Sequence, residues 1–283
     1  MQESFPTVAV FKEAAQLPFQ AVGGMLASIG ILFAAIFAGG IVLVIAFVVN
    51  QESMLAIFEV MARQGSSSAR EMTEPIELAV LVTMVAVVLI VAVIMFFSAH
   101  IFNYWVNYAT FGKEGAHWSF SEGRFSAAVV NALKLLLISI LVMLINYVAI
   151  TVASVLGLGP STSNVQTTVD YAELTLSGLT GTIVTVVATS AIYSLFSANL
   201  TQTSLRSQTE GLEHPHTLDF AIVIILLYAL ILIPTVLAAL TGSSTLTVVV
   251  SSVLTLYLMF TVPIAHGLRY RVCMAEKSED DVV

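Results

Sequence analysis

Five histidines, the side chains best suited to acid–base and metal chemistry at neutral pH, lie near the polar segments of this chain. They are His100, His117, His214, His216 and His266. The same segments carry the carboxylates Glu114, Glu122, Glu210, Glu213 and Asp219. Imidazole and carboxylate groups can bind a divalent metal, and a metal could activate water against a lipid headgroup. The candidate ligands are His117, His214 and His216.

A metal site is nevertheless not the favoured interpretation. The His-Pro-His spacing at 214–216 is compatible with metal binding but not specific for it, and no His-Glu-x-x-His pair occurs. The sequence also lacks a Gly-x-x-x-x-Gly-Lys phosphate loop, a Gly-x-Ser-x-Gly elbow and a Cys-x-x-Cys pair, since Cys273 is the single cysteine. We therefore expect no catalytic residue, no metal and no cofactor.

Small and hydroxyl-bearing residues recur every four positions in three apolar stretches. They are Gly30, Ala34 and Ala38, then Gly181, Thr185 and Thr189, and finally Ser251 and Thr255. Asn146 is the most polar side chain deep inside an apolar run. In lipid, small faces let helices approach closely, and hydroxyl and amide groups bridge between helices. These residues predict either helix packing, which we favour, or a polar pathway lined by the second and third groups.

The composition decides what kind of elements carry these residues. The chain has 283 residues, of which 58% are hydrophobic and 10% are charged. A typical soluble domain has about 25% charged residues, so an ordinary soluble enzyme is excluded and a multi-pass membrane protein is indicated. The net charge of −8 argues against a nucleic-acid partner and against strong attraction to anionic headgroups.

The charge-free runs predict the membrane spans. A spanning helix needs about 20 residues, and the last run, 220–268, is long enough for two spans separated at Thr241-Gly242-Ser243-Ser244. The six predicted spans are 20–49, 77–101, 131–157, 175–200, 219–240 and 245–267. The segment 5–19 is predicted to form a surface helix. The expected fold is an all-α bundle of six transmembrane helices in three hairpins, forming a single membrane domain over 1–283.

The positive charges predict the orientation. Eight of the ten Lys and Arg residues lie at the termini or near the connections 101–130 and 201–218, and only Arg63 and Arg70 lie on the other side. The positive-inside rule therefore predicts cytoplasmic termini in a prokaryotic plasma (inner) membrane. The connection 101–130 also holds both tryptophans, which indicates an interfacial aromatic belt or, alternatively, a partner-binding surface.

No Asp, Glu, Lys or Arg is predicted near the middle of the membrane. Lys134 begins an apolar run of more than 20 residues, so it is placed at the inner edge, as are His100 and His266. An intramembrane carboxylate is the usual basis of ion-coupled transport. Its absence argues against a proton- or ion-coupled pump.

Short similar motifs end alternate spans. Span two ends Phe97-Ser98-Ala99-His100 and span four ends Phe196-Ser197-Ala198-Asn199. With this hairpin layout the chain resembles prokaryotic six-helix membrane proteins, such as the membrane domain attached to some glycerophosphodiester phosphodiesterases. The resemblance implies three hairpins with short inner connections. The catalytic signature of that family's soluble enzyme domain is not present in the sequence, so the resemblance assigns no functional residue.

These observations favour a non-catalytic integral membrane protein, an accessory or scaffold subunit that acts by helix packing. Its expected partners are membrane lipids and either a second copy of itself or a larger membrane complex. The alternative is a permease or channel for a small neutral or lipid-like solute, which the hydroxyl-bearing stripes would line. A third interpretation, a lipid-headgroup enzyme on the inner face, rests on the histidine and carboxylate positions alone.

Overall fold

The structure is a computed structural model that describes residues 5–49, 51, 73–118, 121–155, 171–206 and 216–280. These residues form seven α-helices and no strand, which confirms the all-α fold for the described part of the chain. The helices are α1 (Thr7–Gln20), α2 (Val22–Val49), α4 (Thr73–Phe111), α5 (Glu122–Val155), α6 (Tyr171–Leu205), α7 (Thr217–Leu240) and α8 (Ser244–Asp280).

Six of these helices, all except α1, are long and apolar enough to cross a membrane. In a bilayer the backbone amides have no water to bond, so a spanning segment must satisfy them within its own helix. The chain is therefore a multi-pass membrane protein, as its composition predicts. The side on which the termini lie and the arrangement in three hairpins stay predictions.

Three helices extend well beyond their predicted spans. The span predicted to end at residue 101 continues in α4 to Phe111, and the span predicted to end at 267 continues in α8 to Asp280. The span predicted to begin at 131 starts earlier, because α5 begins at Glu122. The predicted boundaries follow the loss of hydrophobicity, whereas a helix continues while its backbone bonds and side-chain packing persist. The aromatic residues at the start of the predicted 101–130 connection therefore belong to a helix.

The predicted N-terminal helix is confirmed as α1, which packs against α7 and α8. Its buried face consists of Val10, Ala14 and Pro18. Arg271 of α8 donates hydrogen bonds to the carboxylate of Glu13, with the closest N–O distance 2.6 Å. One face of α1 therefore packs on protein.

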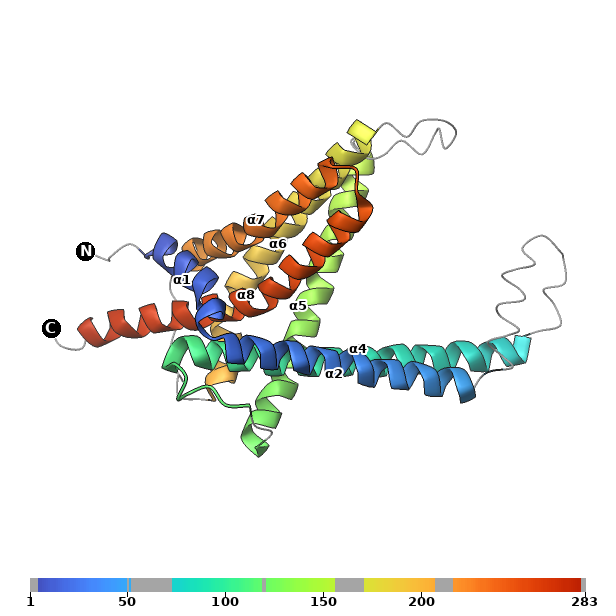
Figure 1. Cartoon of the computed structure of the whole chain (residues 1–283), viewed down its shortest axis with the longest axis horizontal. Helices are drawn as coiled ribbons and strands as arrows, with labels where there is room; N and C mark the ends of the chain where they lie inside the picture. The colour runs from blue at the N-terminus through green and yellow to red at the C-terminus, as the bar shows by residue number, and fades with distance from the viewer. Residues whose placement is uncertain are drawn as a thin grey trace. The chain divides into compact units, whose positions relative to one another are not determined.

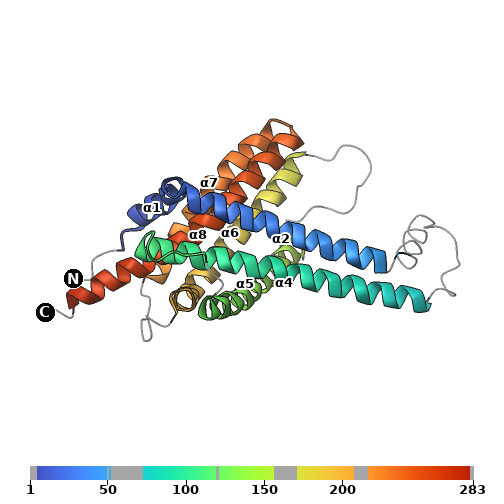
Figure 2. The ribbon, with the colours of Figure 1, turned by 60° about the horizontal axis from the view of Figure 1, so that its bottom comes forward.

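The chain consists of two compact units, and the predicted single domain over 1–283 stays a prediction. The smaller unit, Leu26–Ser98, contains most of α2 and the larger part of α4. The two helices run side by side in opposite directions (Figures 1 and 2), and a methyl group added at Gly39 would lie 3.3 Å from Cγ2 of Ile90. The predicted packing residues Gly30 and Ala34 do not take part in this contact. Both are exposed, and a Cβ at Gly30 would meet nothing within 4 Å.

The larger unit, Met1–Met25 and Ala99–Val283, contains α1, α5–α8 and the end of α4. Helices α6, α7 and α8 run side by side in Figure 1, and α5 packs along α6. The core between them includes Phe102 of α4, Leu135 and Ile138 of α5, Leu200 of α6 and Tyr270 of α8. This unit contains every polar cluster described below.

Helices α7 and α8 are joined by a tight turn at the predicted residues. Helix α7 ends at Leu240 and α8 begins at Ser244. Gly242 has φ +74°, in the left-handed region, and donates its backbone N–H to the carbonyl of Ala239 at 3.0 Å. Glycine at the end of a helix adopts this conformation without the steric cost that a Cβ imposes.

We predict that Gly242→Ala lowers the free energy of unfolding by about 1 kcal/mol, because alanine is strained at this φ. The space around Gly242 is open, so no clash adds to the strain. Thermal unfolding of the purified protein in detergent measures the effect. Gly40→Ala is the matched control, since Gly40 is also open but helical, and it should not be destabilised. A Gly242→Ala variant as stable as the wild type would contradict the prediction.

Candidate functional site

Helix α6 carries a buried stripe of hydroxyl groups along one face. Its members are Ser190, Ser194, Ser197, Thr201 and Ser204, which alternate in spacing between four and three residues. That alternation keeps side chains on one side of a helix with 3.6 residues per turn. The stripe faces the interior of the larger unit, where Ser194, Ser197 and Ser204 contact polar side chains of the neighbouring helices.

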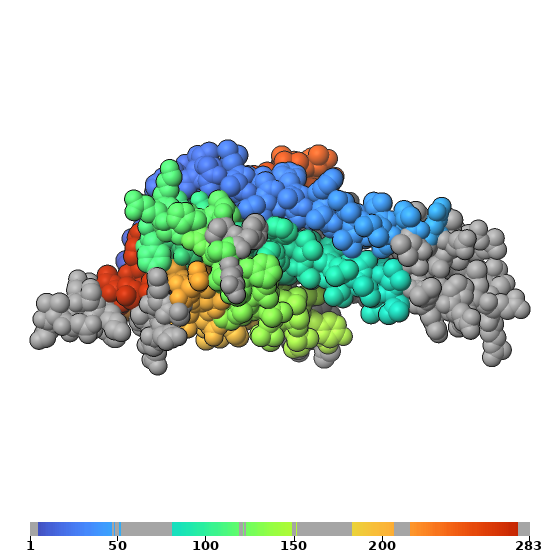
Figure 3. All heavy atoms as spheres, turned by 90° about the horizontal axis from the view of Figure 1, so that it is seen from below, coloured from blue at the N-terminus to red at the C-terminus, as the bar shows by residue number. Residues whose placement is uncertain are grey.

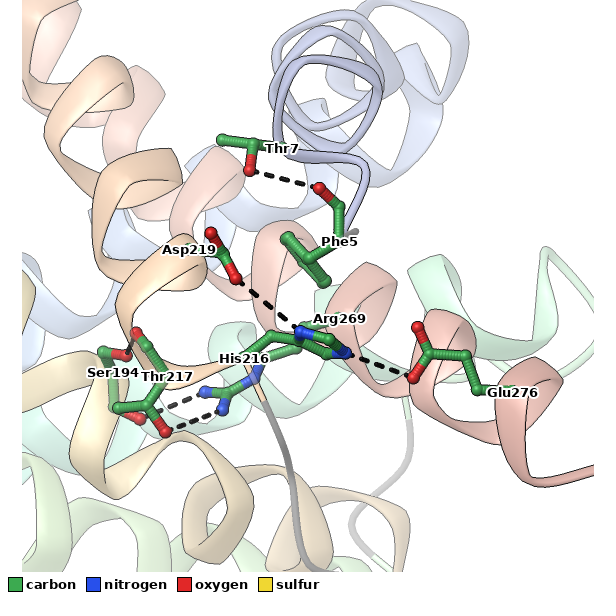
Figure 4. Close-up of polar contacts among 8 residues, drawn as sticks. All are labelled: Phe5, Thr7, Ser194, His216, Thr217, Asp219, Arg269 and Glu276. Atoms are coloured by element: carbon green, nitrogen blue, oxygen red, sulfur yellow. Dashed lines mark hydrogen bonds and ion pairs between the residues drawn. The ribbon is translucent and has the colours of Figure 1, made fainter. Parts of the chain in front are cut away.

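Ser194 contributes to the site that holds Arg269 of α8 (Figure 4). Arg269 is almost fully buried, with 1% of its surface exposed. Its Nη1 donates to the carbonyl of Ser194 at 3.1 Å, and its Nη2 donates to Oγ1 of Thr217 at 3.3 Å. The guanidinium also lies 4.9 Å from the ring centroid of Phe220. Because a buried charge is costly without partners, these contacts tie α6, α7 and α8 together.

Ser197 lies one turn further along α6 and bonds His266 of α8. Its Oγ is 2.7 Å from Nδ1 of the imidazole, which is fully buried. Three aromatic rings surround the imidazole, with centroids 5.0–5.9 Å away: Phe102, Tyr193 and Phe220. His266 is therefore enclosed between helices. Its placement at the edge of a span did not predict this enclosure.

Ser204 closes a buried amide network with Asn103 of α4 and Asn131 of α5. Asn131 Nδ2 donates to Asn103 Oδ1 at 2.6 Å and to the carbonyl of Leu200 at 3.2 Å. Ser204 Oγ donates to Asn103 Oδ1 at 2.8 Å. Because the Leu200 carbonyl can only accept, Asn131 must present its nitrogen, and Asn103 must then present its oxygen. This network leaves Asn103 Nδ2 with no hydrogen-bond partner among the described residues.

A cavity of about 550 Å³ adjoins this network. Buried residues, among them Asn103, Ser204 and His100, form part of its wall. Other parts are lined by exposed or half-buried side chains, including Arg124 and Arg206. Figure 3 shows α5 and the C-terminal end of α6 side by side, and both contribute to the lining. A concavity in which a few polar groups converge is a usual form of a small-molecule site.

The predicted metal candidates occupy different surroundings. His117 lines the cavity, whereas His216 does not. The ring of His216 lies 3.2 Å from a carboxylate oxygen of Glu276 and 3.6 Å from one of Asp219, and it packs on Phe5 (Figure 4). His214 lies outside the described residues. Among the residues that are described, no group of three His, Cys, Asp or Glu side chains could hold a metal ion.

The other predicted residues are also separated. Thr185 donates a hydrogen bond to Oδ1 of Asn146 at 2.7 Å, which joins α6 to α5. Thr189 is buried, Ser251 donates to the carbonyl of Val248 in its own helix, and Thr255 is exposed. Gly181 belongs to the part of α6 whose side-chain surroundings are not described. The bridge between Thr185 and Asn146 is the contact expected from helix packing.

Lys134 adds a further contact between α5 and α6. Its Nζ donates to the carbonyl of Asn199 at 3.1 Å and to Oγ1 of Thr203 at 2.5 Å. The carbonyl partner lies near the C-terminal end of α6, where a cation is favourable because of the helix dipole. The sequence places Lys134 at a membrane edge, but it does not reveal these partners.

The residues that organise this region were not among the predicted site residues. The sequence predicts Arg269 only as one of the positive charges near a terminus, and on α6 it predicts Gly181, Thr185 and Thr189 rather than the stripe. The alternating four–three spacing from Ser190 to Ser204 was the available signal. No signal in the sequence pairs Arg269 with Ser194, because they lie 75 residues apart.

Comparison with protein-family models, curated proteins and solved structures finds no match to this chain. The resemblance to the membrane domain attached to some glycerophosphodiester phosphodiesterases therefore stays a prediction.

We predict that Arg269→Lys lowers the free energy of unfolding by about 1–3 kcal/mol. Lysine keeps the charge but cannot supply the planar fork that bonds two helices and lies over Phe220. Arg271→Lys is the matched control, because its ion pair with Glu13 is half exposed and contributes at most about 1 kcal/mol. Unfolding in mixed detergent micelles, followed by circular dichroism, measures the free energy of unfolding of both variants. Equal losses of unfolding free energy in the two variants would contradict the prediction, because the contacts of the buried Arg269 guanidinium would then stabilise the fold no more than an exposed ion pair does.

Proposed function

We propose that this multi-pass membrane protein is a non-catalytic accessory or scaffold subunit that acts by packing its helices against a second copy or a partner protein. The single observation that carries the proposal is the exposed small face of α2. Gly30 and Ala34 are four residues apart, exposed, and open to a neighbouring helix. In lipid such a face stabilises association because two backbones can approach closely.

The apolar surroundings of this face support the proposal. Large exposed side chains lie beside the small residues, including Phe33 and Phe37, which are one helical turn apart on α2. Lipid tails can cover this surface, but they gain no more contact at a small face than at a large one. A partner helix gains contact area by packing its backbone against the small residues, beside the two phenylalanines. The polar side chains of the larger unit, in contrast, bond one another across helices, which is typical of a structural role.

The sorting of Lys and Arg residues supports cytoplasmic termini in a prokaryotic plasma membrane as part of the same proposal.

We predict that Gly30→Leu weakens self-association or partner binding about tenfold, which corresponds to about 1.4 kcal/mol. The added side chain fills the groove that a partner backbone would occupy, while the open space around Gly30 leaves this chain's own fold intact. Native mass measurement after gentle detergent extraction, combined with energy transfer between labelled copies in vesicles, reports the association.

Gly40→Leu is the control for this experiment, because Gly40 is equally exposed and open but lies on another side of α2. It should associate like the wild type. A wild-type protein that is strictly monomeric, with no co-purifying protein, would overturn the proposal.

The second candidate function, a permease or channel for a small neutral or lipid-like solute, is favoured by the buried hydroxyl stripe of α6. A row of hydroxyl groups can exchange hydrogen bonds with a passing solute. In this interpretation Thr189 and the stripe face the pathway, and the exposed Thr255 faces lipid.

For this candidate, Thr189→Cys is expected to react with a membrane-impermeant thiol reagent, whereas Thr255→Cys is not, because lipid excludes the charged reagent. Cys273 is first replaced by alanine so that the new thiol is the only one. Mass spectrometry of the labelled protein in vesicles gives the extent of reaction. Protection of Thr189→Cys from both sides of the membrane would reject a water-filled pathway at this position.

A further inference from the structure

The cavity beside the amide network combines a buried polar floor with positively charged walls. It has a volume of about 550 Å³, within the range of sites that hold a small ligand or a lipid headgroup. Its floor includes Asn103, which is 8% exposed, and Ser204, which is 3% exposed. The charged side chains of Arg124, Arg206 and Glu114 lie nearer the solvent.

Asn103 is held so that it presents a hydrogen-bond donor. Its Oδ1 accepts from Asn131 and from Ser204, which fixes the direction of the amide. Its buried Nδ2 has no acceptor among the described residues. A buried donor without an acceptor is costly, and an acceptor oxygen from a ligand in the cavity would remove that cost.

The charged side chains indicate that the ligand carries a negative charge. Among the described lining residues, two guanidinium groups stand against one carboxylate, and two imidazoles add further donors. Arg124 donates one hydrogen bond to the carbonyl of His117, at 2.5 Å, out of the five N–H groups that a guanidinium carries. Guanidinium groups bind the oxygens of phosphate in pairs, which lysine cannot do.

The backbone at Arg206 supports a binding role for this residue. Arg206 follows α6 with φ +57°, a conformation that is costly for a residue with a side chain. A left-handed residue is a common way to end a helix, and this position is usually occupied by glycine or asparagine. Here an arginine that lines the cavity occupies it, although a glycine or asparagine would tolerate the same turn at lower cost.

We propose that this cavity binds a phosphate group, with Arg124 and Arg206 paired to its charge and Asn103 Nδ2 donating to one of its oxygens. The phosphate belongs either to a lipid headgroup or to a free phosphate compound. This binding is independent of the packing role of α2, which involves the other compact unit.

The full-length protein, purified in detergent, is titrated with three probes: inorganic phosphate, dioleoyl phosphatidic acid and dioleoylglycerol. Native mass spectrometry counts bound lipid, and isothermal calorimetry measures phosphate. Phosphatidic acid differs from dioleoylglycerol by its phosphate group, so preference for the former isolates the phosphate contribution. Binding of inorganic phosphate identifies a free phosphate source, and binding of phosphatidic acid alone identifies a headgroup.

Two variants test the proposed contacts. Asn103→Asp keeps an oxygen for Asn131 and Ser204 but replaces the free donor with a second acceptor, and Arg206→Gln removes one guanidinium from an exposed position. Each should weaken phosphate or phosphatidic acid binding at least tenfold. Arg271→Gln removes an arginine that does not line the cavity and should change binding less than twofold.

If Asn103→Asp does not fold, as judged by circular dichroism, Arg206→Gln decides alone. The proposal is overturned if the wild type binds neither phosphate nor phosphatidic acid, or binds dioleoylglycerol as strongly as phosphatidic acid without binding inorganic phosphate. It is also overturned if the folded cavity variants bind like the wild type or if Arg271→Gln loses binding equally.

Discussion

The guanidinium of Arg269 is buried between three helices, and its contacts determine much of the arrangement of the larger unit. It donates hydrogen bonds to Ser194 on α6 and to Thr217 at the start of α7, and it lies over the ring of Phe220. If one of these helices shifted along its axis by a single residue, the carbonyl and hydroxyl acceptors would move away from the guanidinium. A buried charge without such partners is far more costly than a mismatch of apolar side chains, so this contact fixes the relative register of α6, α7 and α8.

The neighbouring polar pairs also fix the register of the helices. His266 bonds Ser197, and Asn131 bonds both Asn103 and the backbone of Leu200, so the same face of α6 is matched in turn to α8, α5 and α4. Apolar contacts between helices in lipid are weakly specific, because lipid tails offer similar contacts. Directional bonds between particular atoms therefore select one arrangement of this unit, and they also fix the direction of the Asn103 amide.

The spans were predictable because hydrophobicity and length are properties of a continuous segment, and the Thr241–Ser244 turn interrupts the longest such segment. The ends of α4 and α8 were not predictable in this way, since Trp105 and Arg269 leave the apolar pattern yet stay buried in a helix. Of the residues that line the cavity, the sequence draws attention to His100, His117 and Glu114, because histidines and carboxylates are conspicuous in an apolar chain. Asn103 and Arg206 acquire their significance from contacts and backbone conformation, and neither is visible in a linear pattern.

Helix α8 has 37 residues, so at 1.5 Å per residue it is about 55 Å long, against about 30 Å for the apolar interior of a bilayer. Even at a tilt of 40°, the upper end of the usual range, about eleven of its residues must project into the headgroups and the water beyond. The projecting part is continuous with the embedded part and clasped to α1 by Glu13 and Arg271. Helix α8 therefore supplies the protein surface on which α1 rests outside the apolar interior of the membrane.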